Sequence, residues 1–172
     1  MLKTRFGIEI ELTGITREKA ARITAEFLQG TYSEGGTYYD TKKVTAPDGR
    51  VWKLTYDGSI HCQKRQGRQK IASGKDYSVE LVSPILTYKE DIETLQELVR
   101  RIRKAGGFTN ASCGIHIHLD GAKHTPRSLR NIINIIASKN DLFYKALQIA
   151  PERMRYCKKM DSILVDKINR KK

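Results

Sequence analysis

The strongest constraint on the fold comes from two segments in which apolar and polar residues alternate one by one. The early segment RFGIEIEL alternates apolar residues with Glu9 and Glu11, and the later segment CGIHIHLD alternates them with His116 and His118. Successive side chains of a β-strand point to opposite faces of a sheet, so this period of two predicts strands rather than helices. Each strand would have an apolar side for the core and a side that carries acids or imidazoles.

Other patterns predict further strands and helices. The stretches TYYDTKKVTA and VWKLTYDGSI flank the turn residues PDGR and predict a β-hairpin within residues 37–63, and YSVELVSPI predicts another strand. Residues 64–75 are polar, basic and glycine-containing, and predict a mobile loop. The predicted helices begin at Thr16, after a capping box at Thr87-x-x-Glu90, at Pro126, at Asn140 or Asp141, and at Asp161. Strands joined by a hairpin and mixed with helices predict an α+β fold.

The length and the apolar stripes of the helices indicate how these elements pack. A chain of 172 residues suits one domain, residues 1–172, with a motif core at 5–120 and a helical part at 125–172. The helix after Pro126 has a predicted inward stripe formed by Leu129, Ile132, Ile133 and Ile136. We expect the helices to cover one face of an antiparallel sheet and to leave the other face open.

Five polar residues on the predicted strands would meet on that open face, namely Glu9, Glu11, Glu80, His116 and His118. Residues two apart on one strand lie roughly 6–7 Å from each other on the same side, a distance that one cation or a pair of cations can bridge. Neighbouring carboxylates repel each other, and a cation relieves that repulsion. Oxygen and imidazole ligands without thiolates suit Mg²⁺ or Mn²⁺ better than structural zinc. A solvated polar face is the competing explanation.

The formal net charge of +13 is compatible with several classes of partner. The basic residues gather at the end of the long predicted helix, in residues 64–75 and in the tail 153–172. Such a surface attracts nucleic acid, and it would also suit ATP or an acidic substrate. Cations near a helix C-terminus are common without any ligand, so a solvated basic face is an equal alternative.

Cysteine content and hydropathy predict a cytoplasmic protein. The three cysteines are widely spaced and form no CxxC pair, which argues against a disulfide framework or a thiolate zinc site. No apolar run approaches the roughly 20 residues that cross a bilayer. The chain opens on a strand-like segment rather than a signal peptide. We expect a reducing setting and no membrane partner.

The order of the motifs resembles a known family. FGIEIEL, YDGSI, VELVSPIL, a long helix ending in AGG, and CGIHIHLD follow one another as in the amidoligases, carboxylate–amine ligases related to glutamine synthetase and glutamate–cysteine ligase. The resemblance covers residues 5–120 and continues more weakly through RMRYCKK at 153–159. It implies a glutamine-synthetase-like fold, in which a curved antiparallel sheet holds metal and ATP. It also implies amide formation through an acyl phosphate.

The resemblance assigns roles to individual residues. It implies that Mg²⁺ or Mn²⁺ is bound by Glu9, Glu11, Glu80 and His116. It implies catalytic roles for Asp57, Glu80 and His118. Asp57 would lie near the amine or carboxylate substrate, and His118 near phosphate. Which histidine binds the metal stays open. Cationic contacts to ATP would come from Lys53, Lys64, Arg65 and Arg153. On local grounds alone, the sequence DGS is more typical of a plain turn.

One departure from the family keeps several functions open. The family's C-terminal part carries further strands, with an arginine and an additional glutamate for the nucleotide, and no such strand precedes Lys172. The chain would then be truncated, completed by a partner or a homo-oligomer, or inactive. An inactive module would bind nucleic acid or an acidic partner through its basic surface. A metal-dependent hydrolase is a further alternative. An active ligase would take carboxylates and amines of amino acids, peptides or proteins.

Overall fold

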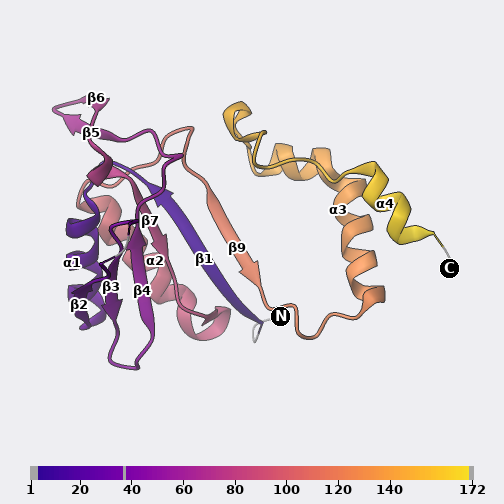
Figure 1. The fold of residues 1–172 in the computed structure, drawn as a ribbon, viewed down its shortest axis with the longest axis horizontal. Helices are drawn as coiled ribbons and strands as arrows, with labels where there is room; N and C mark the ends of the chain where they lie inside the picture. The colour runs from indigo at the N-terminus through magenta and orange to yellow at the C-terminus, as the bar shows by residue number, and fades with distance from the viewer. Residues whose placement is uncertain (1–3, 37, 171–172) are drawn as a thin grey trace. The chain divides into compact units, whose positions relative to one another are not determined.

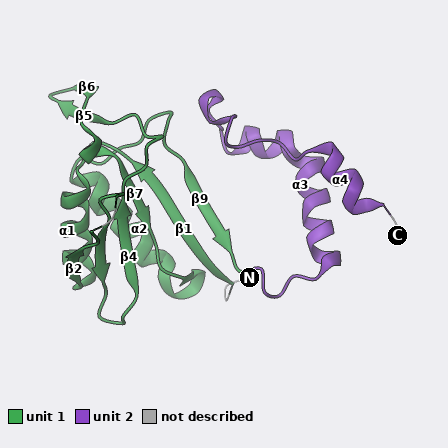
Figure 2. Cartoon of the chain, in the orientation of Figure 1, with its two compact units in different colours: residues 1–120 green, residues 121–172 purple. Residues whose placement is uncertain are grey.

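The computed structural model describes residues 4–36 and 38–170. The chain consists of two compact units, Met1–Asp120 and Gly121–Lys172 (Figure 2). The predicted motif core lies in the first unit, and the predicted helical part lies in the second. That both form one domain stays a prediction.

Among the described residues, seven strands of the first unit form one antiparallel sheet (Figure 1). They are β1 (Arg5–Leu12), β2 (Thr31–Glu34), β3 (Lys42–Thr45), β4 (Val51–Thr55), β7 (Val79–Val82), β8 (Leu86–Thr87) and β9 (Ile115–Leu119). The order is β2-β3-β4-β7-β1, and β1 also pairs with β8 and β9. The sheet is not closed into a barrel, and its combination with helices confirms the predicted mixed class of fold.

Two helices cover one face of this sheet. The first, α1 (Arg17–Leu28), packs on β2, β3 and β4, and the second, α2 (Tyr88–Lys104), packs on β8 and on α1 (Figure 1). The core between helices and sheet includes the fully buried Leu54, Leu81 and Leu98. One face of the sheet is therefore committed to packing.

The starts of both helices follow from their first residues. Thr16 caps α1, because its hydroxyl accepts a hydrogen bond from the Lys19 N–H at 3.2 Å, as predicted. The predicted capping box at α2 does not form, because the Thr87 side chain accepts no hydrogen bond from the first turn of the helix. The Thr87 N–H donates to the Asp91 carboxylate at 2.7 Å, and Glu90 accepts only from the Thr87 hydroxyl. Asp91 is buried and also pairs with Arg50 at 2.7 Å, and this pairing fixes it beneath the helix start.

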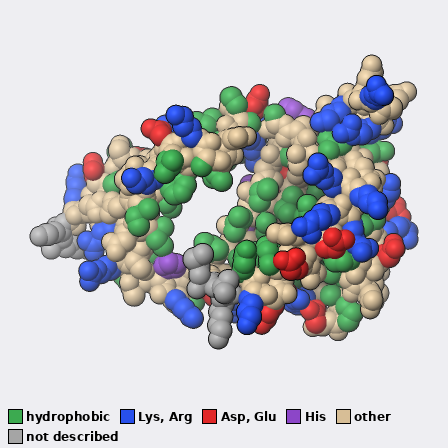
Figure 3. Space-filling view, turned by 180° about the vertical axis from the view of Figure 1, so that it is seen from behind, with side chains coloured by type: hydrophobic (Ala, Val, Ile, Leu, Met, Phe, Trp, Pro, Cys, Tyr) green, Lys and Arg blue, Asp and Glu red, His purple; other side chains and the backbone are tan. Residues whose placement is uncertain are grey.

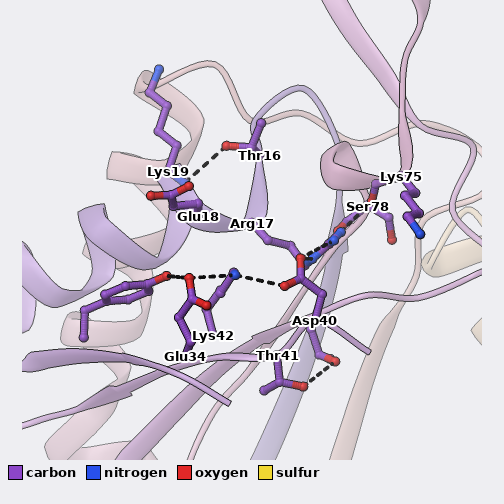
Figure 4. Close-up of polar contacts among 12 residues, drawn as sticks. Thr16, Arg17, Glu18, Lys19, Glu34, Asp40, Thr41, Lys42, Lys75 and Ser78 are labelled. Atoms are coloured by element: carbon purple, nitrogen blue, oxygen red, sulfur yellow. Dashed lines mark hydrogen bonds and ion pairs between the residues drawn. The ribbon is translucent and has the colours of Figure 1, made fainter. Parts of the chain in front are cut away.

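A buried arginine joins α1 to the sheet and its neighbouring loops. Arg17 is 3% exposed, and its guanidinium donates to the Asp40 carboxylate and to the backbone oxygens of Lys75 and Ser78 (Figure 4). Asp40 in turn pairs with Lys42 at 2.9 Å. The two cations beside Asp40 hold the pKa of its carboxyl below its usual range. The arrangement satisfies buried backbone acceptors that no regular strand pairing reaches.

Replacing Arg17 with methionine is expected to lower the free energy of unfolding by about 3 kcal/mol, because the buried Ser78 carbonyl loses the guanidinium that donates to it. Asp40 keeps Lys42, and the Lys75 carbonyl keeps the Ser78 N–H. The matched control is Arg22→Met on the same helix. Arg22 pairs with Glu18 at the surface, where solvent screens an ion pair and leaves it with little effect on stability. Urea unfolding of the two variants measures the difference, and equal losses would contradict a structural role for Arg17.

Several sequence predictions need correction in the first unit. Residues 64–75 do not form a mobile loop, because β5 (Gln63–Gln66) and β6 (Gln69–Ala72) pair as an antiparallel hairpin. Gly67, at a φ of +60°, provides the tight turn between them. The polar composition hid this hairpin, since neither strand has an apolar side to bury. The predicted hairpin within residues 37–63 is confirmed as β3 and β4, although residue 37 lies outside the described range.

The second unit consists of helices. They are α3 (Pro126–Ala146) and α4 (Ser162–Asn169). The start of α3 at Pro126 is confirmed, but no new helix begins at Asn140 or Asp141, because no glycine or proline interrupts the helical run before Pro151. The predicted inward stripe is confirmed only in part, since Leu129 and Ile132 are exposed whereas Ile133 and Ile136 are half-buried. A unit with two helices has little interior in which to bury such a stripe. None of the helices in the described part of the chain has the length and apolar character needed to cross a bilayer.

Candidate metal centre

The pairing of the strands places acidic residues together on the face of the sheet opposite the helices. Glu11 on β1 lies directly opposite Glu80 on β7, and Glu9 lies directly opposite His116 on β9. Directly paired residues share a face of an antiparallel sheet, with Cβ atoms about 5 Å apart. Leu81, beside Glu80 in sequence, is buried in the core on the other face. On β1 and β7, the alternation in the sequence therefore separates the side chains that face the core from those that form the cluster.

Glu9 joins the two histidines of β9. One of its carboxylate oxygens lies 3.1 Å from His116 Nδ1, and the other lies 3.2 Å from His118 Nε2. Both imidazoles are exposed. Glu9 thereby orients both rings toward the acidic side of the sheet.

Glu11 is the most buried member of the cluster, at 3% exposed. Its Oε2 accepts a hydrogen bond from the Gly114 N–H at 2.6 Å. The Glu11 N–H donates to the Gly114 carbonyl at 3.0 Å. The segment that precedes β9 therefore fixes the carboxylate of Glu11 in the interior.

Asp57 enters the cluster from the turn that follows β4. Its Oδ1 accepts from the Ser59 N–H at 2.6 Å, the turn contact that local sequence suggests. The hydroxyl of Ser78 accepts from the Asp57 N–H and donates to the Asp57 carbonyl, at 3.0 and 2.6 Å. Ser78 was absent from the predicted site, and no local pattern signals it, because its contact depends on tertiary pairing. The turn is thus both structural and part of the cluster.

Two sets of three side chains could each hold one metal ion. The first set is Glu9, Glu80 and His116, and the second is Glu11, Asp57 and Glu80. Within each set the ligand atoms lie within 4.8 Å of one another. Glu80 belongs to both sets and therefore occupies the centre of the cluster.

The electrostatics of Glu80 report the crowding of negative charge. Burial, first, and then the charges of Glu9, Asp57 and Glu11 raise the pKa of Glu80 to about 7, while His116 lowers it. A carboxyl group with this pKa is protonated in a large fraction of the protein molecules at neutral pH. A divalent cation would replace that proton and neutralise the neighbouring acids.

The donor set fits a hard divalent cation. Carboxylate oxygens outnumber the single imidazole nitrogen, and the two sets contain no thiolate. Mg²⁺ and Mn²⁺ prefer such ligands. Glu9, Glu80 and His116 would hold one ion, and Glu11, Asp57 and Glu80 would hold a second. The structure brings together every residue predicted as a metal ligand, while the metal itself stays a prediction.

The predicted cationic residues lie at different places. Lys53 is exposed on β4, on the same face as the cluster. Lys64 is exposed on the β5–β6 hairpin. Arg65 stacks on the Phe108 ring at 5.2 Å and lines a cavity of about 560 Å³ on the helix-covered face, away from the carboxylates. Arg153 lies in the second unit, 4.8 Å from the Tyr156 ring. Of the three that belong to the first unit, only Lys53 shares the face of the cluster, and ATP contacts by all four residues stay predictions.

The apolar side of β9 departs from expectation. The sequence predicts that the apolar sides of all strands face the helices, and Phe6, Ile8 and Ile10 of β1 do pack against the core. Ile115 and Ile117 of β9 are 62% and 63% exposed. The reason is position, because β9 pairs only with β1 and lies at the edge of the sheet, beyond the strands on which α1 and α2 pack.

Comparison with known proteins supports one family. A family model described as "Putative amidoligase enzyme" matches residues 2–172. No curated protein and no solved structure matches the chain. The match spans both units, so it includes the helices that follow the motif core.

Proposed function

Because the chain belongs to the amidoligase family, we propose that it is an ATP- and Mg²⁺-dependent ligase that joins a carboxylate to an amine. The observation that carries this proposal is the pair of three-ligand sets that share Glu80 on the open face of the sheet. Phosphoryl transfer requires divalent cations beside the phosphate oxygens, and this cluster offers two places for them. The antiparallel sheet, with helices on one face and acids on the other, supports the glutamine-synthetase-like fold that the family implies.

The side chains of the cluster divide the proposed reaction among them. Bound Mg²⁺ would neutralise the charge that develops on the phosphate oxygens. The substrate carboxylate attacks the γ-phosphorus of ATP, and ADP leaves. The amine then attacks the acyl phosphate carbon, and inorganic phosphate leaves with the proton that the amine releases, while Asp57 orients the amine by accepting a hydrogen bond from it. His118, oriented by Glu9, donates a hydrogen bond to a phosphate oxygen, and Lys53 faces the same ligand as a cation.

The proposal is tested by a trapping assay. The protein receives Mg²⁺ and ATP, with glutamate or a glutamate-containing peptide as the carboxylate and hydroxylamine as the amine. We expect one hydroxamate for each ADP formed. With ¹⁸O in the carboxylate, one ¹⁸O should appear in the released phosphate, because the acyl phosphate breaks at its carbonyl carbon. Product formed without ATP would instead indicate a hydrolase, and the absence of ATP turnover with every carboxylate would contradict the ligase.

The basic hairpin supports a second candidate, a module that binds nucleic acid or an acidic partner. Arg65 and Lys70 both lie over the Phe108 ring, at 5.2 and 4.5 Å, and Lys and Arg side chains gather over β5 and β6 (Figure 3). Clustered cations attract the phosphate backbone of nucleic acid. This candidate predicts an affinity for oligonucleotides that falls steeply with salt and that Glu80→Ala leaves unchanged.

A further inference from the structure

Two lysines face each other across neighbouring strands on the open face of the sheet. Lys43 on β3 lies directly opposite Lys53 on β4. Side chains in such a pair have Cβ atoms about 5 Å apart, and like charges in this position destabilise a sheet. An anionic partner beside the two lysines would relieve this repulsion.

Neither amine has such a partner within the described parts of the chain, since no ion pair or hydrogen bond involves the Lys43 or Lys53 side chain. The adjacent Lys42 shows the contrast. Lys42 points to the helix-covered face, where Asp40 and Glu34 lie 2.9 and 3.3 Å from its Nζ (Figure 4). The fold therefore neutralises the buried lysine and leaves the pair on the open face as two positive charges.

The pair lies in line with the carboxylate cluster. Lys53 is directly paired with Val82, and Val82 is directly paired with Glu9. Neighbouring strands are about 4.8 Å apart, so about 10 Å separates the Cα atoms of Lys53 and Glu9. The long, flexible side chain of Lys53 can lie over the uncharged Val82 with its amine toward the cluster. A ligand of modest length would touch the lysines and the cluster at once.

We propose that Lys43 and Lys53 form an anion-binding pair that holds a phosphate or carboxylate group of the ligand engaged at the cluster. This inference rests on the proposed function, since metal ions would neutralise the acids and leave the lysines as excess positive charge on this face. The anion is either part of the ATP phosphate chain or a second carboxylate of an acidic substrate. In the second case the pair selects dicarboxylates over monocarboxylates.

The first test requires no catalysis. The melting temperature of the protein is measured with and without inorganic tripolyphosphate and with and without glutarate, in wild type, Lys43→Met, Lys53→Met and the double variant. We expect at least one anion to raise the melting temperature of wild type and to lose that effect in the double variant. Without anion, Lys43→Met should be more stable than wild type, because the repulsion is gone. Lys89→Met, an exposed lysine on α2, is the control.

The second test separates the two sources of the anion. In the trapping assay, the KM values of the double variant are compared with those of wild type. An increase of about tenfold or more in the KM for ATP alone would identify the nucleotide phosphates as the anion. The same increase for glutamate alone would identify the substrate carboxylate. If neither KM changes and the double variant keeps the stabilisation by anions, the proposal is overturned. Because the melting experiment does not depend on turnover, an inactive wild-type protein would overturn the ligase without deciding the lysine pair.

Discussion

Replacement of Glu80 with alanine is expected to abolish divalent-metal binding at the carboxylate cluster. Glu80 is the only member common to both ligand sets among the described residues. Removal of a single outer partner of a metal ligand already weakens binding by about 10- to 100-fold, and loss of a ligand should exceed this. We expect the affinity for Mn²⁺ to fall at least about 100-fold at both sites, and ATP turnover to disappear with it.

The other ligands should separate the two sites. Glu9→Ala removes a ligand from the first set and leaves Glu11, Asp57 and Glu80 in place. Asp57→Ala does the reverse. Calorimetric titration with Mn²⁺ should therefore show two ions bound to wild type, one to each of these variants and none to Glu80→Ala. Glu93→Ala, which removes an exposed acid on α2, is the matched control. A Glu80→Ala protein that titrates like wild type would contradict both proposed metal sites.

The metal-free protein is expected to become less stable as the pH rises from about 5 to 8. The folded-state pKa of Glu80 is about 7 and its ordinary value is 4.5, so the folded protein binds more protons than the unfolded chain between these values. Stability that depends on the extra proton is present below the lower pKa and is lost as the pH passes the upper one. With an allowance for solvent screening, the loss is about 2 kcal/mol.

Two changes should remove this dependence. Glu80→Gln stays neutral at every pH, so its free energy of unfolding should exceed that of wild type at pH 8 by about 2 kcal/mol in the presence of a chelator. Saturating Mg²⁺ should restore the stability of wild type at pH 8 and have little effect on Glu80→Gln. Urea unfolding at pH 5, 6, 7 and 8 measures both effects, with Glu93→Gln as control. Parallel pH profiles for wild type and Glu80→Gln would exclude repulsion at Glu80 as the cause.

Local sequence patterns predicted the strands that carry the carboxylate cluster more accurately than they predicted the other strands and helices of the chain. The alternation in RFGIEIEL and CGIHIHLD predicted β1 and β9, because one apolar side and one polar side is a property of the strand itself. The same rule missed the β5–β6 hairpin, whose strands are polar on both sides. A different rule, that Asn or Asp caps a helix, placed a helix boundary at Asn140 or Asp141, where the helix continues. Capping residues are common within helices, so the pattern alone does not fix a boundary.

Two kinds of information define the cluster that the acid-bearing strand β1 and the histidine-bearing strand β9 carry. The sequence by itself determined which side chains share a side of each strand, since that depends only on the period of two, and the family resemblance added Asp57. Only the tertiary structure decided that Glu80 lies at the centre, that Ser78 and Gly114 hold the neighbouring acids, and that Lys43 faces Lys53. These facts depend on strand order and register. Contacts between distant segments set both, and no local pattern encodes them.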